Sequence, residues 1–140
     1  LLVIAFLFKA ACENLGMSEY IISKVAPLMA GQALPFVVFL VSTLMTFALA
    51  NAWGVSAIMV PFVIPLAQAI DANLAVAIAA IFSGSVCGTQ LCFYSDNSIL
   101  IGQATGIQPL DHVKTQMPFA LCAAALTSIT YLAYGFLFLG

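Results

Sequence analysis

Three stretches of this 140-residue sequence carry no charged side chain, and they limit what the chain can fold into. One lies between Lys24 and Asp71, the next between Asp71 and Asp96, and the last runs from Thr115 to Gly140. Such runs are typical of membrane-spanning helices, which need about 20 apolar residues each. Because the first run is too long for one crossing, we expect it to contain a break.

The composition excludes a water-soluble globule. Hydrophobic residues make up 64% of the chain and charged residues 6%, and the mean hydropathy is +1.18, which leaves too little polar surface to face water. We therefore expect an all-α fold, a polytopic bundle of transmembrane helices in a plasma (bacterial inner) membrane, with the lipid bilayer as its partner. The net charge of -2 comes from five acids and three lysines, which gives no basis for nucleic-acid binding.

The chain starts with the apolar residues Leu1 to Ile4, without an initiator Met or a basic segment, so we expect no signal peptide. We expect one partial transporter domain, residues 1–140, as the C-terminal portion of a longer chain, with the missing N-terminal portion as a partner. Lys9 and Glu13 stand four residues apart on the first apolar stretch. They either pair inside the membrane or lie at its water interface, where lysine snorkels readily.

Polar residues and prolines interrupt the longest uncharged run. An apolar helix over Phe36 to Ala50 should stop at the tetrapeptide Asn51 to Gly54, the first expected break. The next apolar stretch, Val55 to Ala69, contains Pro61 and Pro65, each of which lacks a backbone donor. We therefore predict two half-length helical pieces there, with an unwound centre between them.

A second interruption follows an Ala-rich helix that is expected over Asn73 to Val86. Ala80, Gly84 and Gly88 recur at every fourth residue, a pattern of small residues that lets two membrane helices pack closely. Beyond this helix, Gly88 to Ser98 forms a polar patch within apolar sequence, which we expect to be the second break.

The last part of the chain should hold a loop and a closing span. Gln108 to Lys114 is the most water-compatible stretch, and we predict a surface loop or interfacial turn there. Its His112 is either a pH sensor or a solvated loop residue. Met117 to Leu139 should then cross the membrane, with Tyr131 and Tyr134 in an interfacial aromatic belt.

The two breaks together are the predicted site. Unwound backbone persists at membrane depth only where it is buried in protein or lines a wet cavity. Transporters built from inverted repeats place two discontinuous helices near the bilayer midplane, with the broken ends facing the cargo. We expect this bundle with broken helices to be one half of such a repeat.

Asp96 is the leading candidate for the site. A carboxylate at mid-bilayer costs about 2.5 to 3.5 kcal/mol on insertion scales, and no lysine is close to Asp96 in the sequence. A bound cation or proton would neutralise it, and Ser95, Asn97 and Ser98 would add the neutral oxygens that suit a sodium-like ion. The alternative is an aspartate at the membrane surface that caps the next helix.

Asn51 is the second predicted ligand, with Thr46 and Ser56 within one or two helical turns as further neutral oxygens. Trp53 and Gly54 would shape this break. Together with the carboxylate described above, Asn51 is predicted to bind Na+. The alternative makes Asn51 a helix cap and Trp53 an interfacial anchor.

No covalent chemistry is expected. The sequence contains no HExxH, GxSxG or Walker motif and no Gly-rich dinucleotide turn, so it predicts neither an enzyme nor a cofactor site. Its four cysteines form no CxxC pair and fit small apolar positions in helices.

Two stretches carry a family resemblance. Thr46 to Pro61 has a polar break around Asn-Ala-Trp-Gly, followed by an apolar run with prolines. Tyr94 to Ser98 contains Ser-Asp-Asn, and Asp111 to Phe119 reads Asp-His-Val-Lys-Thr-Gln-Met-Pro-Phe. In these stretches the chain resembles the C-terminal part of NhaC-type sodium/proton antiporters of the ion transporter superfamily, whose motifs are Ser-Trp-Gly, Ser-Asp-Thr and Asp-His-x-x-Thr-Gln-x-Pro-Tyr. The similarity runs through nearly the whole chain, which would be roughly the last third of the family's proteins.

One position departs from the family pattern. The family has Gly-Asp where Gly88 and Thr89 stand here. The resemblance implies a secondary transporter, and its site residues carry over most directly to Asp96, to Asn97 and to the Trp53–Gly54 pair. Because the family also includes exchangers of small organic acids, the threonine at position 89 leaves room for a different cargo.

The leading hypothesis is Na+/H+ antiport across the plasma membrane, with a midplane site at Asp96 that binds cation and proton alternately. The first alternative is a sodium- or proton-coupled carrier of a small carboxylate or amino acid. The second is a membrane subunit that transports nothing and whose breaks seat a partner helix. Na+, H+ or a small organic solute would be cargo, no cofactor is expected, and the oligomeric state, a homo-oligomer included, stays open.

Overall fold

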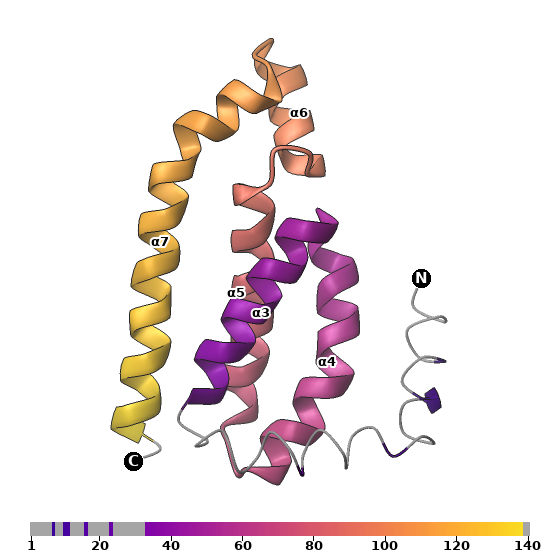
Figure 1. Ribbon diagram of the computed structural model, residues 1–140, viewed down its shortest axis with the longest axis vertical. Helices are drawn as coiled ribbons and strands as arrows, with labels where there is room; N and C mark the ends of the chain where they lie inside the picture. The colour runs from indigo at the N-terminus through magenta and orange to yellow at the C-terminus, as the bar shows by residue number, and fades with distance from the viewer. Residues whose placement is uncertain (1–6, 8–9, 12–15, 17–22, 24–32, 139–140) are drawn as a thin grey trace.

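Figure 1 shows a computed structural model of the chain, in which helices run up and down a bundle. The structure describes residues 33–138 and the isolated positions 7, 10, 11, 16 and 23, so the predicted pair Lys9 and Glu13 lies outside the described residues. The helices, in chain order, are α3 (Leu34–Leu49), α4 (Ala52–Ala69), α5 (Leu74–Leu91), α6 (Asp96–Thr105) and α7 (Pro109–Phe138). The part of the chain that is described contains no strand, which confirms the all-α prediction.

Three helices, α4, α5 and α7, are long and apolar enough to cross a membrane, whereas α3 is apolar but shorter. Large apolar side chains cover the outside of the bundle, for example Leu44 on α3 and Phe119 on α7, which are 61% and 76% exposed. A soluble protein rarely exposes so large an apolar surface. The predicted transmembrane helix bundle is therefore confirmed.

α3 and α4 form an antiparallel hairpin with a two-residue turn. Ala50 ends α3 in the left-handed conformation, with a φ of 56°, and its N–H donates to the Thr46 carbonyl at 2.7 Å. Asn51 caps α4, because its side-chain oxygen accepts from the Gly54 N–H at 3.0 Å. The predicted break at Asn51 to Gly54 is thus too long, since its last three residues form the first turn of α4.

α4 is continuous through both of its prolines, so the predicted unwound centre within Val55 to Ala69 is wrong. Pro61 and Pro65 lie inside the 18-residue helix. They stand four residues apart and therefore share one face, which confines the loss of backbone bonds to one side of the helix. Packing against neighbouring helices holds such a membrane helix together; here Val63 and Ala67 of α4 are buried in the core.

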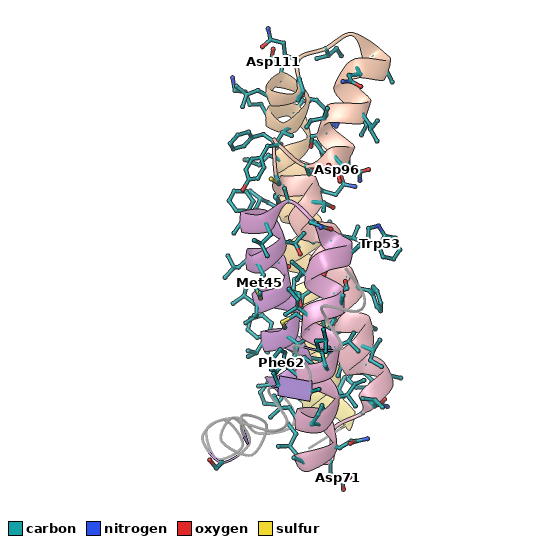
Figure 2. The ribbon with its side chains drawn as sticks, turned by 90° about the vertical axis from the view of Figure 1, so that its right-hand side faces the viewer. Met45, Trp53, Phe62, Asp71, Asp96 and Asp111 are labelled. Carbon is teal, nitrogen blue, oxygen red and sulfur yellow. The ribbon has the colours of Figure 1, made fainter. Side chains whose placement is uncertain are left out.

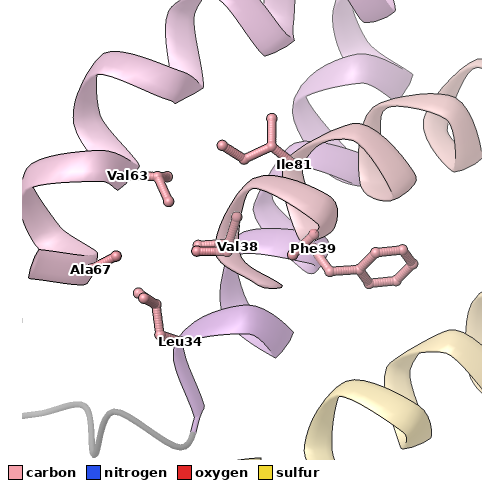
Figure 3. Packing of buried hydrophobic residues seen from close by; sticks show 8 residues of the cluster. Leu34, Val38, Phe39, Val63, Ala67 and Ile81 are labelled. Carbon is pink, nitrogen blue, oxygen red and sulfur yellow. The ribbon is translucent and has the colours of Figure 1, made fainter. Parts of the chain in front are cut away.

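The core lies between α3, α4 and α5. Figure 3 shows Val38, Val63 and Ile81 turned toward one another, whereas the Phe39 ring extends away from them. The buried apolar residues of this cluster are Leu34, Val38 and Phe39 on α3, Val63 and Ala67 on α4, and Ala77, Ala80 and Ile81 on α5.

Glycines on α5 allow α3 to approach its backbone. A β-carbon added at Gly84 would lie 2.5 Å from the Phe39 carbonyl oxygen, and one added at Gly88 would lie 2.6 Å from the Thr43 carbonyl oxygen. The predicted close packing by the small residues of this helix is therefore confirmed. The helix itself is longer than predicted, because it continues past Val86 to its end at Leu91.

α6 lies beyond the C-terminal end of α5, so the two helices form one interrupted helix (Figure 1). Only residues 92–95 are outside helix here, which corrects the predicted break at Gly88 to Ser98. The first residues of this predicted break, Gly88 to Leu91, stay helical because α5 is packed against α3 at Gly88. The last residues of the predicted break, Asp96 to Ser98, are helical because the Ser95 hydroxyl accepts from the Ser98 N–H and caps α6 there.

α7 returns along the bundle and packs against α3, α5 and α6. It begins at Pro109, so the predicted loop over Gln108 to Lys114 is wrong and the closing span predicted from Met117 starts too late. Proline suits the first helical position, where its missing N–H needs no partner. The N-terminal part of α7 bends toward α6 in Figure 1, and Pro118, inside the helix, is of the residue type that bends helices.

The two tyrosines near the end of α7 fasten it to the bundle. The Tyr131 ring lies against the Phe39 ring with centroids 5.7 Å apart, and its hydroxyl is 2.8 Å from the Ser83 hydroxyl. The Tyr134 hydroxyl accepts from the Asn73 amide at 3.2 Å. Their place in an interfacial aromatic belt stays a prediction, as does the inverted repeat.

Candidate functional site

The turn after α3 and the turn after α5 meet at one end of the core. The Tyr94 hydroxyl lies 2.9 Å from the carbonyl oxygens of Phe47 and Ala48 and donates to them. These carbonyls belong to the last turn of α3, where the helix supplies no donor of its own. Tyr94 therefore fastens the second break to the first. Tyr94 was not among the predicted site residues, although an aromatic residue with a polar tip inside a polar patch was the available signal.

The serines of the second break point inward and stabilise the turn between α5 and α6. The Ser95 hydroxyl lies 2.8 Å from the Thr89 carbonyl oxygen and 3.1 Å from that of Cys92. The Ser98 hydroxyl donates to the Cys92 carbonyl at 2.8 Å and is 3.1 Å from the Ser95 hydroxyl. Both side chains are buried. These oxygens already hold the turn together, and their binding of an ion stays a prediction.

Asp96 and Asn97 differ from these serines because both are exposed. Asp96 is the first residue of α6, where the positive end of the helix dipole favours its charge. The side chain that caps α6 belongs to Ser95, so the alternative is wrong in making Asp96 the cap, while its place at the membrane surface stays a prediction. Within residues 33–138, no side chain forms a hydrogen bond or ion pair with the Asp96 carboxylate, whereas Asp111 pairs with Lys114 at 3.7 Å.

The residues of the first break surround the start of α4. Asn51 is exposed and uses its oxygen in the helix cap, so the helix-cap part of the alternative is confirmed. Trp53 as an interfacial anchor and Na+ binding by Asn51 stay predictions. A β-carbon at Gly54 would lie 2.9 Å from the Asn51 amide nitrogen, so the glycine makes room for the cap. Trp53 is 80% exposed, and Figure 2 shows Trp53 and Asp96 projecting on the same side of the bundle.

The predicted oxygen cluster around Asn51 divides in the structure. Thr46 and Ser56 are buried, whereas Asn51 is exposed. The Ser56 hydroxyl donates to the Ser85 hydroxyl at 3.1 Å, and the Thr46 hydroxyl has no hydrogen-bond partner among the described residues. The polar atoms of the first break therefore separate into an exposed group at the turn and a buried group below it.

Thr89, where the family pattern has an acid, lies in the last turn of α5. Its hydroxyl donates to the Val86 carbonyl at 2.7 Å, within its own helix. Its neighbour Gln90 accepts from the Gln116 amide of α7 at 2.8 Å. A groove of about 630 Å³ opens between α5 and α7, and none of the eight predicted site residues lines it.

A metal site of the usual protein ligands is not found in the part of the chain that the structure describes. No three His, Cys, Asp or Glu side chains come together there. A cation at Asp96 would therefore depend on neutral oxygens, such as those of Asn97, or on residues outside the described part. The geometry offers one exposed carboxylate, Asp96, directly after the second helix break.

Comparison with known proteins identifies the family. The Na+/H+ antiporter family matches this chain over residues 1–136. The chain belongs to this family. The predicted resemblance to sodium/proton antiporters is thereby confirmed at the level of the family, and an integral membrane protein built of apolar helices is in keeping with it.

Two relatives extend the comparison. An uncharacterized protein of Haemophilus influenzae is 31% identical over 145 residues, which cover 100% of this chain and 27% of that protein. The malate-2H(+)/Na(+)-lactate antiporter of Bacillus subtilis is 26% identical over 132 residues, which cover 89% of this chain and 28% of that protein. The chain thus spans between a quarter and a third of the length of these relatives. No solved structure gives a significant match.

Proposed function

We propose that this chain is part of an NhaC-type secondary transporter that exchanges Na+ for H+ across the plasma membrane, with Asp96 as the exchanging group. The observation that carries the proposal is the position of Asp96, which begins α6 directly after a helix break and has no partner within residues 33–138. A carboxylate at membrane depth is costly unless a cation or proton neutralises it. Membership of the Na+/H+ antiporter family supports this assignment.

The contacts around Asp96 give each neighbour a role. Ser95 and Ser98 hold the turn in shape, and Tyr94 ties it to α3, so the backbone that carries Asp96 is held in place beside the site. The carboxylate takes either Na+ or a proton, and the proton leaves when Na+ enters. Asn97 adds an oxygen beside it. Exposure of this one site to each side of the membrane in turn yields exchange.

The proposal is tested by Na+-driven proton movement in inverted membrane vesicles that contain the full-length protein. Addition of NaCl should release protons from acidified vesicles, followed as recovery of acridine orange fluorescence. Asp96→Asn keeps the shape of the side chain and should abolish the signal. Asp111→Asn is the matched control, because this exposed aspartate pairs with Lys114 outside the two breaks, and it should retain the signal. Full activity of Asp96→Asn would refute the proposal.

A carrier of a small carboxylate is the second candidate. The Bacillus subtilis relative is named as a malate/lactate antiporter, and Thr89 stands where the family pattern has an acid. In a carrier of this kind, Asp96 still binds the coupling ion, Na+ or H+, while the positive end of α6 attracts the anionic solute.

Uptake of radiolabelled malate or lactate into proteoliposomes, driven by an imposed Na+ gradient, distinguishes the two candidates. Uptake that requires the gradient supports the carrier. Na+-driven proton movement without uptake of either acid supports Na+/H+ antiport. The non-transporting subunit, which the sequence left open, predicts no flux in either assay.

A further inference from the structure

Four buried serine and threonine side chains lie between α3, α4 and α5, below the exposed turn at Asn51. None of the four is more than 5% exposed. The Ser56 hydroxyl of α4 donates to the Ser85 hydroxyl of α5 at 3.1 Å. We call this group the hydroxyl cluster; its members are Ser42, Thr46, Ser56 and Ser85.

The members of the hydroxyl cluster lie at one level of the bundle. On α3, Ser42 packs against Gly84 and Thr46 packs against Gly88, since β-carbons added at these glycines would lie 2.9 Å and 2.7 Å from the two side chains. Ser85 lies between these glycines on α5. Four residues of helix rise about 6 Å, so the cluster extends over little more than one helical turn.

Two members of the cluster have no partner. The hydroxyls of Ser42 and Thr46 are fully buried and form no hydrogen bond with any described residue. Serine and threonine in helices commonly donate to a carbonyl three or four residues back, and Thr43, Thr127 and Ser128 do so here. Ser42 and Thr46 do not, although buried polar groups are nearly always satisfied. Their oxygens are left available for a ligand.

Two helices end about one turn beyond Thr46 and Gly88. α3 ends at Leu49, three residues after Thr46, and α5 ends at Leu91, three residues after Gly88. Both helices direct the negative ends of their dipoles to this end of the core, but the positive ends of α4 and α6 lie there too, so the preference for a cation rests on the hydroxyl oxygens. Hydroxyl oxygens are neutral ligands that suit a small hard cation.

We propose that the hydroxyl cluster is a second cation site, which takes a dehydrated Na+ ion between α3, α4 and α5. The inference rests on the proposed function in taking Na+ as the ion. With the ion bound, Ser42 and Thr46 offer it a lone pair and turn their protons to carbonyls of their own helix, as Thr43 already does, while the Ser56 hydroxyl keeps its proton on the Ser85 oxygen. Because it needs no carboxylate, this site binds Na+ without releasing a proton, unlike Asp96.

Equilibrium binding of 22Na+ to the purified full-length protein tests the site without any need for turnover. Thr46→Val preserves the shape of the side chain and removes its hydroxyl, and Ser42→Ala removes the other unpartnered oxygen. Loss of an outer partner already weakens a metal site about tenfold, so each variant should raise the Kd for Na+ by at least that factor. Thr43→Val, whose hydroxyl is bound to a carbonyl, should bind Na+ like the wild type.

Without Na+, the thermal unfolding temperature of Thr46→Val should be close to that of the wild type, because the lost hydroxyl has no partner. A lower unfolding temperature would reveal a folding defect separately from a loss of Na+ binding. Wild-type affinity in both Thr46→Val and Ser42→Ala would mean that the cluster holds water only, and would overturn the inference. Na+-driven proton movement, measured in vesicles, decides the antiport proposal independently. Binding that requires Thr46 in a protein without such movement would support the site and refute antiport.

Discussion

Replacement of Gly84 by alanine should separate α3 from α5. The added β-carbon would lie 2.5 Å from the Phe39 carbonyl oxygen and 2.9 Å from the Ser42 β-carbon, whereas ordinary contacts begin at 3.4 Å. A backbone carbonyl cannot rotate away as the end of a side chain can. The two helices must therefore move apart by about 0.9 Å at this level.

The cost of this separation follows from the packing. Overfilling a well-packed core costs about 1 to 3 kcal/mol, and the upper end applies to Gly84 because the obstacle is backbone. Alanine regains about 1 kcal/mol over glycine through its higher helix propensity. The free energy of unfolding should therefore fall by about 2 kcal/mol.

Equilibrium unfolding of the full-length protein by SDS in mixed micelles measures this change. Gly54→Ala is the comparison, because its β-carbon would meet only the Asn51 side chain, which can rotate at the cost of one cap bond, about 1 kcal/mol. The gain in helix propensity offsets that loss, so Gly54→Ala should be close to the wild type. Equal stability of Gly84→Ala and Gly54→Ala would refute the close approach of α3 and α5.

Three further contacts can be tested by substitution. Tyr94→Phe leaves two carbonyls of α3 without a donor and should lower the free energy of unfolding by about 1 to 2 kcal/mol; unchanged amide hydrogen exchange in the turn after α3 would contradict this contact. Ser95→Ala removes the cap of α6 and should cost about 2 kcal/mol in the SDS titration, and a loss below about 0.5 kcal/mol would argue against the cap. Leucine at Gln90 and at Gln116, singly and together, should reveal a coupling of about 1 kcal/mol, and additive effects would rule out their hydrogen bond.

The close packing of α5 was predictable because its signal is local. Small residues at every fourth position lie on one face of any helix, and a membrane helix uses such a face to approach another. Gly84 and Gly88 indeed lie against the α3 backbone. The sequence spacing did not identify α3 as the partner, since that depends on how the hairpin of α3 and α4 folds back.

Helix boundaries were predicted poorly where a local rule competes with packing. Pro61 and Pro65 disfavour helix by their own chemistry, yet α4 runs through both because its other face is buried in the core. The polar stretch after Gln108 reads as a loop by composition, but Pro109 suits a helix start and α6 supplies a packing surface for α7.

The contacts that build the site join segments that are far apart in the sequence. Tyr94 bonds the Phe47 carbonyl across 47 positions, and Ser56 bonds Ser85 across 29. No periodicity within one helix reveals such pairs. Asp96 was recognisable because an isolated acid in apolar sequence is costly, but its exposure and the inward orientation of Ser95 depend on the turn geometry.

The most direct test of the exchange at Asp96 is proton release on Na+ binding to the purified full-length protein. NaCl is added to the protein in weakly buffered detergent solution, and a pH-indicator dye reports released protons, with choline chloride as the control for ionic strength. The wild type should release protons as Na+ replaces the proton on the carboxylate, and Asp96→Asn should release none. Equal proton release by the wild type and Asp96→Asn would contradict the assignment.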